Sequence, residues 1–425
     1  MRELEGKKLL VLGGNNMSKE IVRKARELGV HTTVTDWYDT QRSPVKLMAD
    51  DFWNTSIEDY DELSNSIKEN HIDGVLTGFT DSYLLPYQRL CELNGLPCYG
   101  TKKQFEIFTS KNFYKELCRK NGVPTIEEYS IDSPNIVYPV LVKPVDGSGS
   151  RGITICHNKE QLEEAVKIAE SSSKQKKVII ERYMDGREVT VFWLFVNGEY
   201  YLTTIGNRHV KHNQEGNIIP LPVGYTFPSV YLKKYQADVE EKAKRMFHSV
   251  GVKDGMMFMQ CKVENDTCYV YDIGYRLSGS IEYKILKRVY GVDPLEMLIR
   301  FSLTGKMTND TLDDRIIPSK MKPSFNVSCL CAPGTIKDIT GLDDVKSFTE
   351  IIDVVRAHYP GQTITEQMKG LLTQITVRVL GTVENKTQLY PTMKKVQDAI
   401  RIISTEDKDL LLPGIEKEDI DGYVL

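Results

Sequence analysis

A lysine followed by small, flexible residues is the feature of this sequence whose residue types point first to chemistry. Lys143 ends an apolar stretch, and the segment after it is rich in small residues, namely Gly147, Ser148, Gly149, Ser150 and Gly152. Glycine tolerates positive φ, so successive backbone N–H groups can turn toward an anion while the lysine ammonium adds a charge that suits a phosphate. The lysine precedes the glycines, which excludes the GxxxxGK[ST] phosphate loop. An ordinary glycine and serine turn remains the alternative.

Two later segments carry carboxylates at the ends of expected strands. Glu181 ends one strand and Glu188 begins the next, and such a connection can offer backbone groups to a base and a carboxylate to ribose hydroxyls. Further on, Asp272 and Arg276 lie four residues apart at a strand end, with Gln260 on the strand before it. Oxygen ligands on adjacent strands suit a Mg²⁺ ion between two phosphates, and an arginine can offset charge that develops in phosphoryl transfer. Taken singly, each segment is equally well explained by a solvated turn or a structural ion pair.

The order of these pieces resembles that of the ATP-grasp superfamily. A lysine in a helix, Lys111, precedes Lys143 and its glycine loop; the pattern E-x-x-x-x-G-x-E follows, and the carboxylate and arginine segment comes last. Four motifs in one order are far less frequent by chance than any one of them. The resemblance covers nearly the whole chain and is to the branch of biotin carboxylase and carbamoyl phosphate synthetase, of the carboxylate–amine ligase type.

The resemblance implies a nucleotide-binding role for several residues. Lys111 and Lys143 would contact the α- and β-phosphates of ATP, and the loop that ends at Gly152 would fold over the triphosphate. Glu188 would bind the ribose. The adenine would lie on a hinge of four residues, Glu181, Arg182, Tyr183 and Met184.

The resemblance also implies a metal site and catalytic residues. Asp272 and Gln260 would hold Mg²⁺ or Mn²⁺, while Arg276 and Lys143 would stabilise the charge of the transferred phosphoryl group. The family usually has a glutamate in place of Gln260 and Glu-x-Asn where this chain has Asp-Ile-Gly, ending at Gly274. One anionic ligand therefore remains in place of two.

A long segment before the metal hairpin, residues 205–229, is rich in turn formers, and long loops in compact domains are often functional. Its basic residues are Arg208, His209, Lys211 and His212. Either Arg208 or Lys211 could reach the γ-phosphate or an acidic substrate, so Lys211 is a further candidate catalytic residue. A solvated basic loop explains the same pattern.

Alternating apolar strands and amphipathic helices predict an α/β domain over residues 1–103. The strands are expected at 7–14, 31–36, 72–79 and 96–99, and the helices at 17–29, 57–70 and 83–94. The first strand ends in two glycines, as in a Rossmann-like fold, but the GxGxxG spacing is missing and a nicotinamide cofactor is disfavoured. The resemblance implies that this domain helps to bind the acceptor substrate.

The rest of the chain mixes α/β and α+β patterns. We expect an ATP-grasp domain over residues 104–308, which opens with a helix at 104–122 and contains a small lid subdomain at about 125–184. Hairpins are expected at 187–207, with an Asn-Gly turn, and at 255–275, after a helix at 237–252. Residues 309–425 are expected to form a β-rich α+β supporting region that completes the ATP-grasp core, with strands at 325–332 and 372–381 and a helix at 393–403.

Composition limits the class of protein. The chain has 425 residues, 27% of them charged, with a formal net charge of -4 spread along the sequence, so nucleic acid and membrane surfaces are not expected partners. Eight cysteines without a CxxC pair are typical of reduced thiols. Without a leader-like or membrane-spanning apolar run we expect a cytoplasmic protein, with a homodimer as one possible assembly.

The expected function is an ATP-dependent ligase that activates a carboxylate as an acylphosphate for attack by an amine. Its substrates would be a small carboxylate and a small amine, neither of which the sequence identifies. Two alternatives stay open: an enzyme that activates bicarbonate together with partner proteins, and a nucleotide-binding protein that lacks ligase activity.

Overall fold

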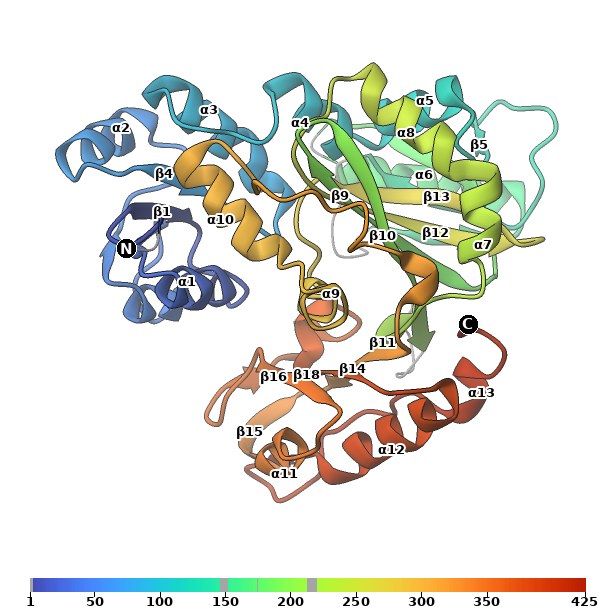
Figure 1. The fold of residues 1–425 in the computed structure, drawn as a ribbon. Helices are drawn as coiled ribbons and strands as arrows, with labels where there is room; N and C mark the ends of the chain where they lie inside the picture. Colours follow the sequence, from blue (N-terminus) through green and yellow to red (C-terminus); the bar gives the residue numbers. More distant parts are fainter. Residues whose placement is uncertain (1–2, 146–151, 174, 212–219) are drawn as a thin grey trace.

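The computed structural model describes residues 3–145, 152–173, 175–211 and 220–425. Figure 1 shows the N-terminal region on one side, a large sheet with its lid on the other, and the C-terminal region below them. In the part of the chain that is described, no helix is long and apolar enough to cross a membrane.

The N-terminal region is a parallel sheet in the order β3-β2-β1-β4. Its strands are β1 Lys8–Leu12, β2 His31–Thr35, β3 Asp51–Trp53 and β4 Gly74–Leu76. The α-helices packed with it are α1 Ser18–Glu27, α2 Tyr60–Glu69 and α3 Leu84–Asn94, and short 3-10 turns occur at η1 Pro44–Met48 and η2 Asp81–Tyr83. The strand expected at residues 96–99 is wrong. The ring of Tyr99 is packed between other aromatic rings, so its apolar character reflects burial in a non-strand segment.

The helix expected at 104–122 is two helices. α4 Lys102–Thr109 and α5 Lys111–Asn121 meet at Ser110, whose φ of -104° and ψ of 116° are extended. Gly122 then ends α5 in the left-handed conformation, at a φ of 72°, which glycine adopts without steric cost. The break makes Lys111 the first residue of its helix.

The lid is a separate antiparallel sheet in the order β5-β8-β6-β7. Its strands are β5 Glu128–Tyr129, β6 Val140–Pro144, β7 Thr154–Cys156 and β8 Val178–Arg182. Helix α6 Lys159–Ser172 covers one face with Leu162, Ala165 and Ala169, which form a small core of their own with the strands. The strand β7 therefore follows the glycine segment closely.

The main sheet is antiparallel and has eight strands in the order β13-β12-β9-β10-β11-β14-β18-β16. They are β9 Glu188–Val196, β10 Glu199–Lys211, β11 Leu221–Phe227, β12 Gly255–Glu264, β13 Thr267–Gly274, β14 Ser324–Leu330, β16 Ile351–Arg356 and β18 Ile375–Thr382. The helical segments beside it are α7 Leu232–Tyr235, η3 Gln236–Glu240, α8 Glu241–Ser249 and α9 Tyr283–Tyr290, whereas α10 Pro294–Thr304 packs against β4, β1 and α1 of the N-terminal region. Strands from the C-terminal region continue this sheet, so the sheet crosses the boundary expected at residue 308.

The described residues of the segment 205–229 lie mostly in strands, which corrects the expectation of a loop on both sides of residues 212–219. β10 extends to Lys211, and β11 is buried along its whole length. Pro222 and Gly224 made β11 resemble a turn in the sequence. Both residues lie within a seven-residue strand that pairs with β10 and β14; His212 lies outside the described residues.

The C-terminal region adds a three-stranded sheet in the order β17-β15-β19 around a second core. Its elements are β15 Gly334–Thr340, α11 Leu342–Lys346, β17 Thr363–Ile364, α12 Leu389–Ala399, β19 Arg401–Ser404 and α13 Lys417–Ile420, with 3-10 turns at η4 Pro318–Lys320, η5 Glu366–Met368, η6 Leu372–Gln374 and η7 Lys386–Gln388. The helix expected at 393–403 stops at Ala399, because Arg401 already pairs with Thr340 in the sheet.

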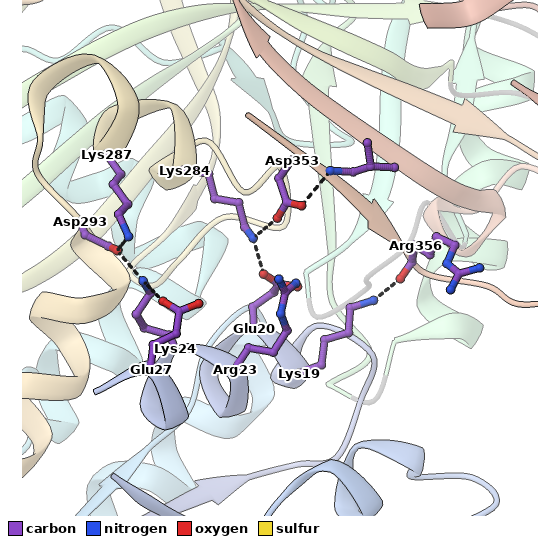
Figure 2. A network of polar contacts seen from close by, with 11 residues as sticks. Lys19, Glu20, Arg23, Lys24, Glu27, Lys284, Lys287, Asp293, Asp353 and Arg356 are labelled. Carbon is purple, nitrogen blue, oxygen red and sulfur yellow. Dashed lines mark hydrogen bonds and ion pairs between the residues drawn. The ribbon is translucent and has the colours of Figure 1, made fainter. Parts of the chain in front are cut away.

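Helix α9 joins the three regions. The ammonium of Lys284 lies 2.5 Å from a carboxylate oxygen of Glu20 in α1 and 2.5 Å from one of Asp353 in β16. Figure 2 shows this lysine between the two carboxylates. One side chain therefore connects the N-terminal sheet to the far end of the main sheet.

Candidate functional site

The predicted phosphate lysine lies in a buried ion-pair group. Lys143 of β6 places its ammonium 2.7 Å from a carboxylate oxygen of Glu181 in β8, and the other oxygen of Glu181 contacts Lys115 of α5. Lys143 and Glu181 are diagonal neighbours on one face of the lid sheet, since Glu181 is registered with Leu141. Burial, together with the charges of Lys115 and Lys111, holds the pKa of Lys143 well below its usual value. The carboxylate of Glu181 thus positions the lysine.

The hinge residues differ in which of their hydrogen-bonding groups are already paired within the protein. The side chain of Arg182 makes a two-point ion pair with Glu264, at 3.2 and 2.9 Å. The backbone amides of Arg182 and Tyr183 donate to carbonyl groups of the lid. The next amide, that of Met184, has no hydrogen-bond partner among the described residues, and its side chain is buried. A donor beside an apolar side chain is suited to the edge and the face of an adenine ring.

Glu188, the predicted ribose ligand, is buried and surrounded by donors. Its carboxylate contacts Arg208, lies 2.9 Å from the ammonium of Lys262 and accepts a hydrogen bond of 3.0 Å from the hydroxyl of Tyr271. Burial would raise the pKa of Glu188, but Arg208 and Lys262 outweigh that effect and hold the pKa below its usual value. The structure brings Arg208 to this carboxylate. A ribose hydroxyl that donates to Glu188 would therefore share the carboxylate with Arg208, Lys262 and Tyr271.

The predicted metal ligands are neighbours. Asp272 of β13 and Gln260 of β12 are cross-strand partners, and the hydroxyl of Tyr114 in α5 donates to Asp272 at 3.4 Å. Burial raises the pKa of Asp272; the cations Lys111 and Lys143 act against this rise without cancelling it. α5 thus directs its first turn toward the end of β13.

The two oxygen-bearing side chains do not form a complete metal site. Among the described residues, no group of three His, Cys, Asp or Glu could hold an ion. Mg²⁺ normally takes six ligands and keeps several waters. Asp272 and Gln260 can therefore hold this ion if phosphate oxygens and water supply the other ligands, which fits a metal that arrives with a nucleotide.

Arg276 follows the same strand end and is fixed from both sides. Its guanidinium makes a two-point ion pair with Asp81 of the N-terminal region, at 2.8 and 2.6 Å, and lies 5.0 Å from the ring centre of Phe258. Asp81 follows β4, so the pair connects the end of a parallel strand to the end of β13. A planar guanidinium held in this way is a preorganised cation beside Asp272.

The outcome differs for the other predicted residues. Gly147, Ser148, Gly149 and Ser150 lie outside the described residues. Gly152 is described and has a φ of 70°, with Pro144 and Ser172 closely packed around it. Lys211 pairs with Asp419 at 2.9 Å and with Glu416 at 3.4 Å. Its contacts are therefore with the C-terminal segment, and its catalytic role stays a prediction.

Sequence reasoning missed several charged residues that lie near the predicted site residues. Lys115 follows Lys111 by four positions and so lies on the same side of α5, a spacing that could have indicated it. Lys262 follows Gln260 by two positions on one strand, which also predicts a shared face. Glu282 and Arg378 had no local signal, because neither belongs to a motif with a fixed spacing.

A cavity of about 520 Å³ lies away from these residues, at the junction around α9. It is lined mainly by charged side chains, among them Glu20, Arg23, Lys24, Glu27, Lys284, Lys287, Arg288, Asp293 and Asp353. Figure 2 shows that many of these charges pair with one another, as Lys24 does with Glu27 and Asp293 at 2.6 and 3.0 Å. The described lining includes no residue that the sequence singled out, so we assign the cavity to the contact between regions.

Comparison with known proteins agrees with the geometry. The family model described as an ATP-grasp domain matches residues 136–282, which span the lid, the hinge and the metal hairpin. This chain contains an ATP-grasp domain. The match includes Lys143, Glu188 and Asp272, so three of the segments described above lie inside one domain of known type.

Similarity to known proteins extends beyond the matched domain. The carbamoyl phosphate synthase large chain of Clostridium beijerinckii is 22% identical over 95% of this chain, which spans only 38% of that relative. A solved L-amino acid ligase from Bacillus licheniformis has a TM-score of 0.75 at 20% identity and covers 94% of this chain and 99% of its own. The biotin carboxylase domain of the Hydrogenobacter thermophilus 2-oxoglutarate carboxylase, in complex with MgADP, ADP and bicarbonate, has a TM-score of 0.75 at 18% identity, with 96% and 91% covered. These likenesses show that nearly the whole chain shares the fold of these two solved structures.

Proposed function

We propose that this chain is an ATP-dependent ligase that activates a carboxylate as an acylphosphate and joins it to an amine, with ADP and phosphate as the other products. The observation that carries the proposal is the set of cations, Lys111, Lys143 and Arg276, whose charges all act on Asp272. Three cations around one carboxylate are suited to a polyphosphate with its divalent ion. Activation is required because a carboxylate is a poor electrophile at neutral pH.

The residues around the nucleotide would act mainly by position and charge. Lys143 and Lys111 would bind phosphate oxygens, and Glu181 would hold Lys143 in place through their 2.7 Å contact. The amide of Met184 would donate to the adenine, and Glu188 would accept from the ribose. In phosphoryl transfer most of the rate enhancement comes from such positioning and from charge stabilisation.

Asp272 and Gln260 would be the protein ligands of Mg²⁺ or Mn²⁺, the cofactor we propose together with ATP. When bound, the ion would neutralise charge on the phosphate oxygens. Arg276, held by Asp81, would stabilise the charge that develops on the transferred group from the other side. The single anionic ligand is thus supplemented by a fixed arginine.

The substrates we propose are a small carboxylate and a small amine. A cytoplasmic location and assembly as a homodimer remain predictions from the sequence. Activation of bicarbonate, or nucleotide binding without ligation, would use the same phosphate residues, and the reaction products distinguish the three possibilities.

The test is ADP release from MgATP with pooled small carboxylates and amines, followed by mass spectrometry of the product. We expect Lys143→Met and Asp272→Asn each to lower the rate by about a hundredfold or more, as loss of a transition-state charge partner does. Lys322→Met, which removes an exposed ion pair with Glu384, is the control and should keep the wild-type rate.

The outcomes separate the alternatives. Normal turnover in Lys143→Met or Asp272→Asn would show that these residues do not act on the phosphates. Nucleotide binding without ADP release in any pool would leave a nucleotide-binding protein. ADP release that depends on bicarbonate alone, with no amide product, would identify bicarbonate as the acceptor.

A further inference from the structure

One face of the main sheet carries a continuous row of polar side chains. Lys262, Glu188, Arg208, Tyr225 and Asn326 are successive cross-strand partners, from β12 through β9, β10 and β11 to β14. Residues directly opposite one another on neighbouring strands point to the same side of a sheet. The row therefore crosses five strands and includes the predicted ribose ligand, Glu188, near one end.

The next strand adds an arginine to this face. Arg378 of β18 is registered with Ser328, which lies two positions after Asn326 on β14, so both face the same side. The guanidinium of Arg378 donates to the hydroxyl of Ser328 at 2.8 Å. Within the described part of the chain, no carboxylate lies within ion-pair distance of it. A guanidinium has five N–H donors, so most of its donors are left for another group.

Two buried acceptors lie beside this arginine. Glu282 is 1% exposed and Asn326 0% exposed. Ser280 joins them: its hydroxyl donates to Glu282 at 2.7 Å, and its carbonyl accepts from the amide nitrogen of Asn326 at 2.5 Å. The remaining oxygens, Oε1 of Glu282 and Oδ1 of Asn326, have no hydrogen-bond partner among the described residues. Buried polar atoms without a partner are costly and call for an explanation.

The charges have an order along this face. The charges of Arg378 and Arg276 both act against the rise that burial causes in the pKa of Glu282. In the order of the main sheet, β14 with Asn326 lies between β13, which Arg276 follows, and β18 with Arg378. Arg378 is therefore farther than Asn326 from the predicted phosphoryl-transfer end. A ligand that satisfies both would present a donor group near the reaction centre and an anion beyond it.

We propose that the amine substrate is an amino acid, held with its ammonium on Glu282 and Asn326 and its carboxylate on Arg378. An ammonium has three donors for the two open acceptors, and a carboxylate matches the planar fork of a guanidinium. The orientation places the nitrogen toward Arg276, where the acylphosphate would form, and the unreactive carboxylate away from it. This assignment of the substrate class rests on the proposed function, but the binding itself can be measured without catalysis.

The test compares matched ligands. Each proteinogenic L-amino acid is titrated into the full chain by calorimetry in the presence of ADP and Mg²⁺. The tightest binder is then compared with its decarboxylated amine and its deaminated acid. We expect the wild type to bind the amino acid at least about tenfold more tightly than either fragment, since each lacks one charged contact.

The variants should divide the two contacts. Arg378→Gln removes the partner of the ligand's carboxylate. The variant should therefore bind the amino acid and the deaminated acid about ten- to a hundredfold less tightly, and its affinity for the amine should not change. Glu282→Gln should bind the amino acid and the amine less tightly, and its affinity for the deaminated acid should not change. Lys322→Gln is the control and should bind all three as the wild type does.

Three results would overturn the proposal. If no L-amino acid binds, or if both variants weaken all three ligands alike, water serves the open polar atoms and the residues act only in the structure. Selective binding without ADP release in any pool would refute the ligase function while the amino acid site stands. ADP release with amines that lack a carboxylate, unaffected by Arg378→Gln, would support the ligase function and refute the site.

Discussion

Glu181 and Glu282 are both buried carboxylates, but within the described residues only Glu181 is in contact with cationic side chains. Glu181 lies between the ammonium groups of Lys143 and Lys115, which compensate its charge. Glu282 has a serine hydroxyl and one open oxygen, and burial raises its pKa to about 7. The first carboxylate positions a cation for phosphate, whereas the second is left in an environment that a cationic ligand would complete.

The raised pKa of Glu282 makes stability depend on pH. A carboxyl group with a folded-state pKa of about 7 binds a proton more tightly in the folded than in the unfolded chain. Its contribution is therefore fully present below the unfolded pKa, near 4.5, and is lost as the pH rises through 7. The Glu282→Gln variant has no such loss. The difference between its free energy of unfolding and that of the wild type should therefore grow in favour of the variant by about 3 kcal/mol from pH 4.5 to pH 8. Urea denaturation across that pH range measures the difference.

A constant difference between the two proteins over this range would show that folding does not shift the pKa of Glu282. The matched control is Glu384→Gln, an exposed carboxylate whose partner is Lys322. Its stability should follow the wild type at each pH.

At the scale of elements, the hairpin of β12 and β13 explains why this chain departs from the family pattern. Phe258 and Gly274 are cross-strand partners, and a Cβ at Gly274 would overlap the ring of Phe258. The same ring supports the guanidinium of Arg276 at 5.0 Å. The asparagine usual at this position has no room here, because an aromatic side chain occupies the space.

We therefore predict that Gly274→Ala is destabilising by about 1 to 3 kcal/mol, the usual cost of overpacking. The double variant with Phe258→Ala should recover part of the loss that the new methyl group causes, measured as a coupling energy in urea denaturation. Additive effects of the two substitutions would contradict the clash. Gly198→Ala serves as the control, since no atom lies within 4 Å of an added Cβ there, although its φ of 86° adds a strain unrelated to Phe258.

At the scale of the whole molecule, the regions are joined by ion pairs between distant parts of the chain. Asp81 and Arg276 are 195 positions apart, and Lys284 reaches both Glu20 and Asp353. Burial would raise the pKa of Asp353, but Lys284 outweighs it and holds the pKa below its usual value. These contacts fix the N-terminal region against the strands that carry the site.

Lys284→Met should lower the free energy of unfolding by about 3 kcal/mol, because it leaves two carboxylates in a largely buried place without their shared cation. The loss should diminish as the pH falls, since Asp353 contributes stability above its unfolded pKa and loses it as protonation sets in. Urea denaturation at neutral and acidic pH measures both effects. Lys394→Met, which removes an exposed pair with Asp398, should cause no measurable change, and an equal effect of the two variants would contradict a special role for Lys284.

Local spacing allowed the sequence to predict the motifs and most elements that carry them. Lys143, Glu188 and Asp272 lie at the strand ends expected for them. Errors occurred where burial or turn-forming residues obscured the local pattern. β11 was taken for part of a loop because of Pro222 and Gly224, and the break at Ser110 gave no signal within an otherwise periodic helix.

The sequence by itself determined the family resemblance and the order of the nucleotide-binding segments, because these depend on residue type and on short spacings. Only the tertiary structure decided which distant residues share a face. The row from Glu188 through Arg208 and Tyr225 to Asn326 depends on strand register, and register pairs residues whose separation along the chain has no fixed value. For the same reason Glu282 and Arg378 became candidates for substrate binding only once the strands and the α9 segment were in place.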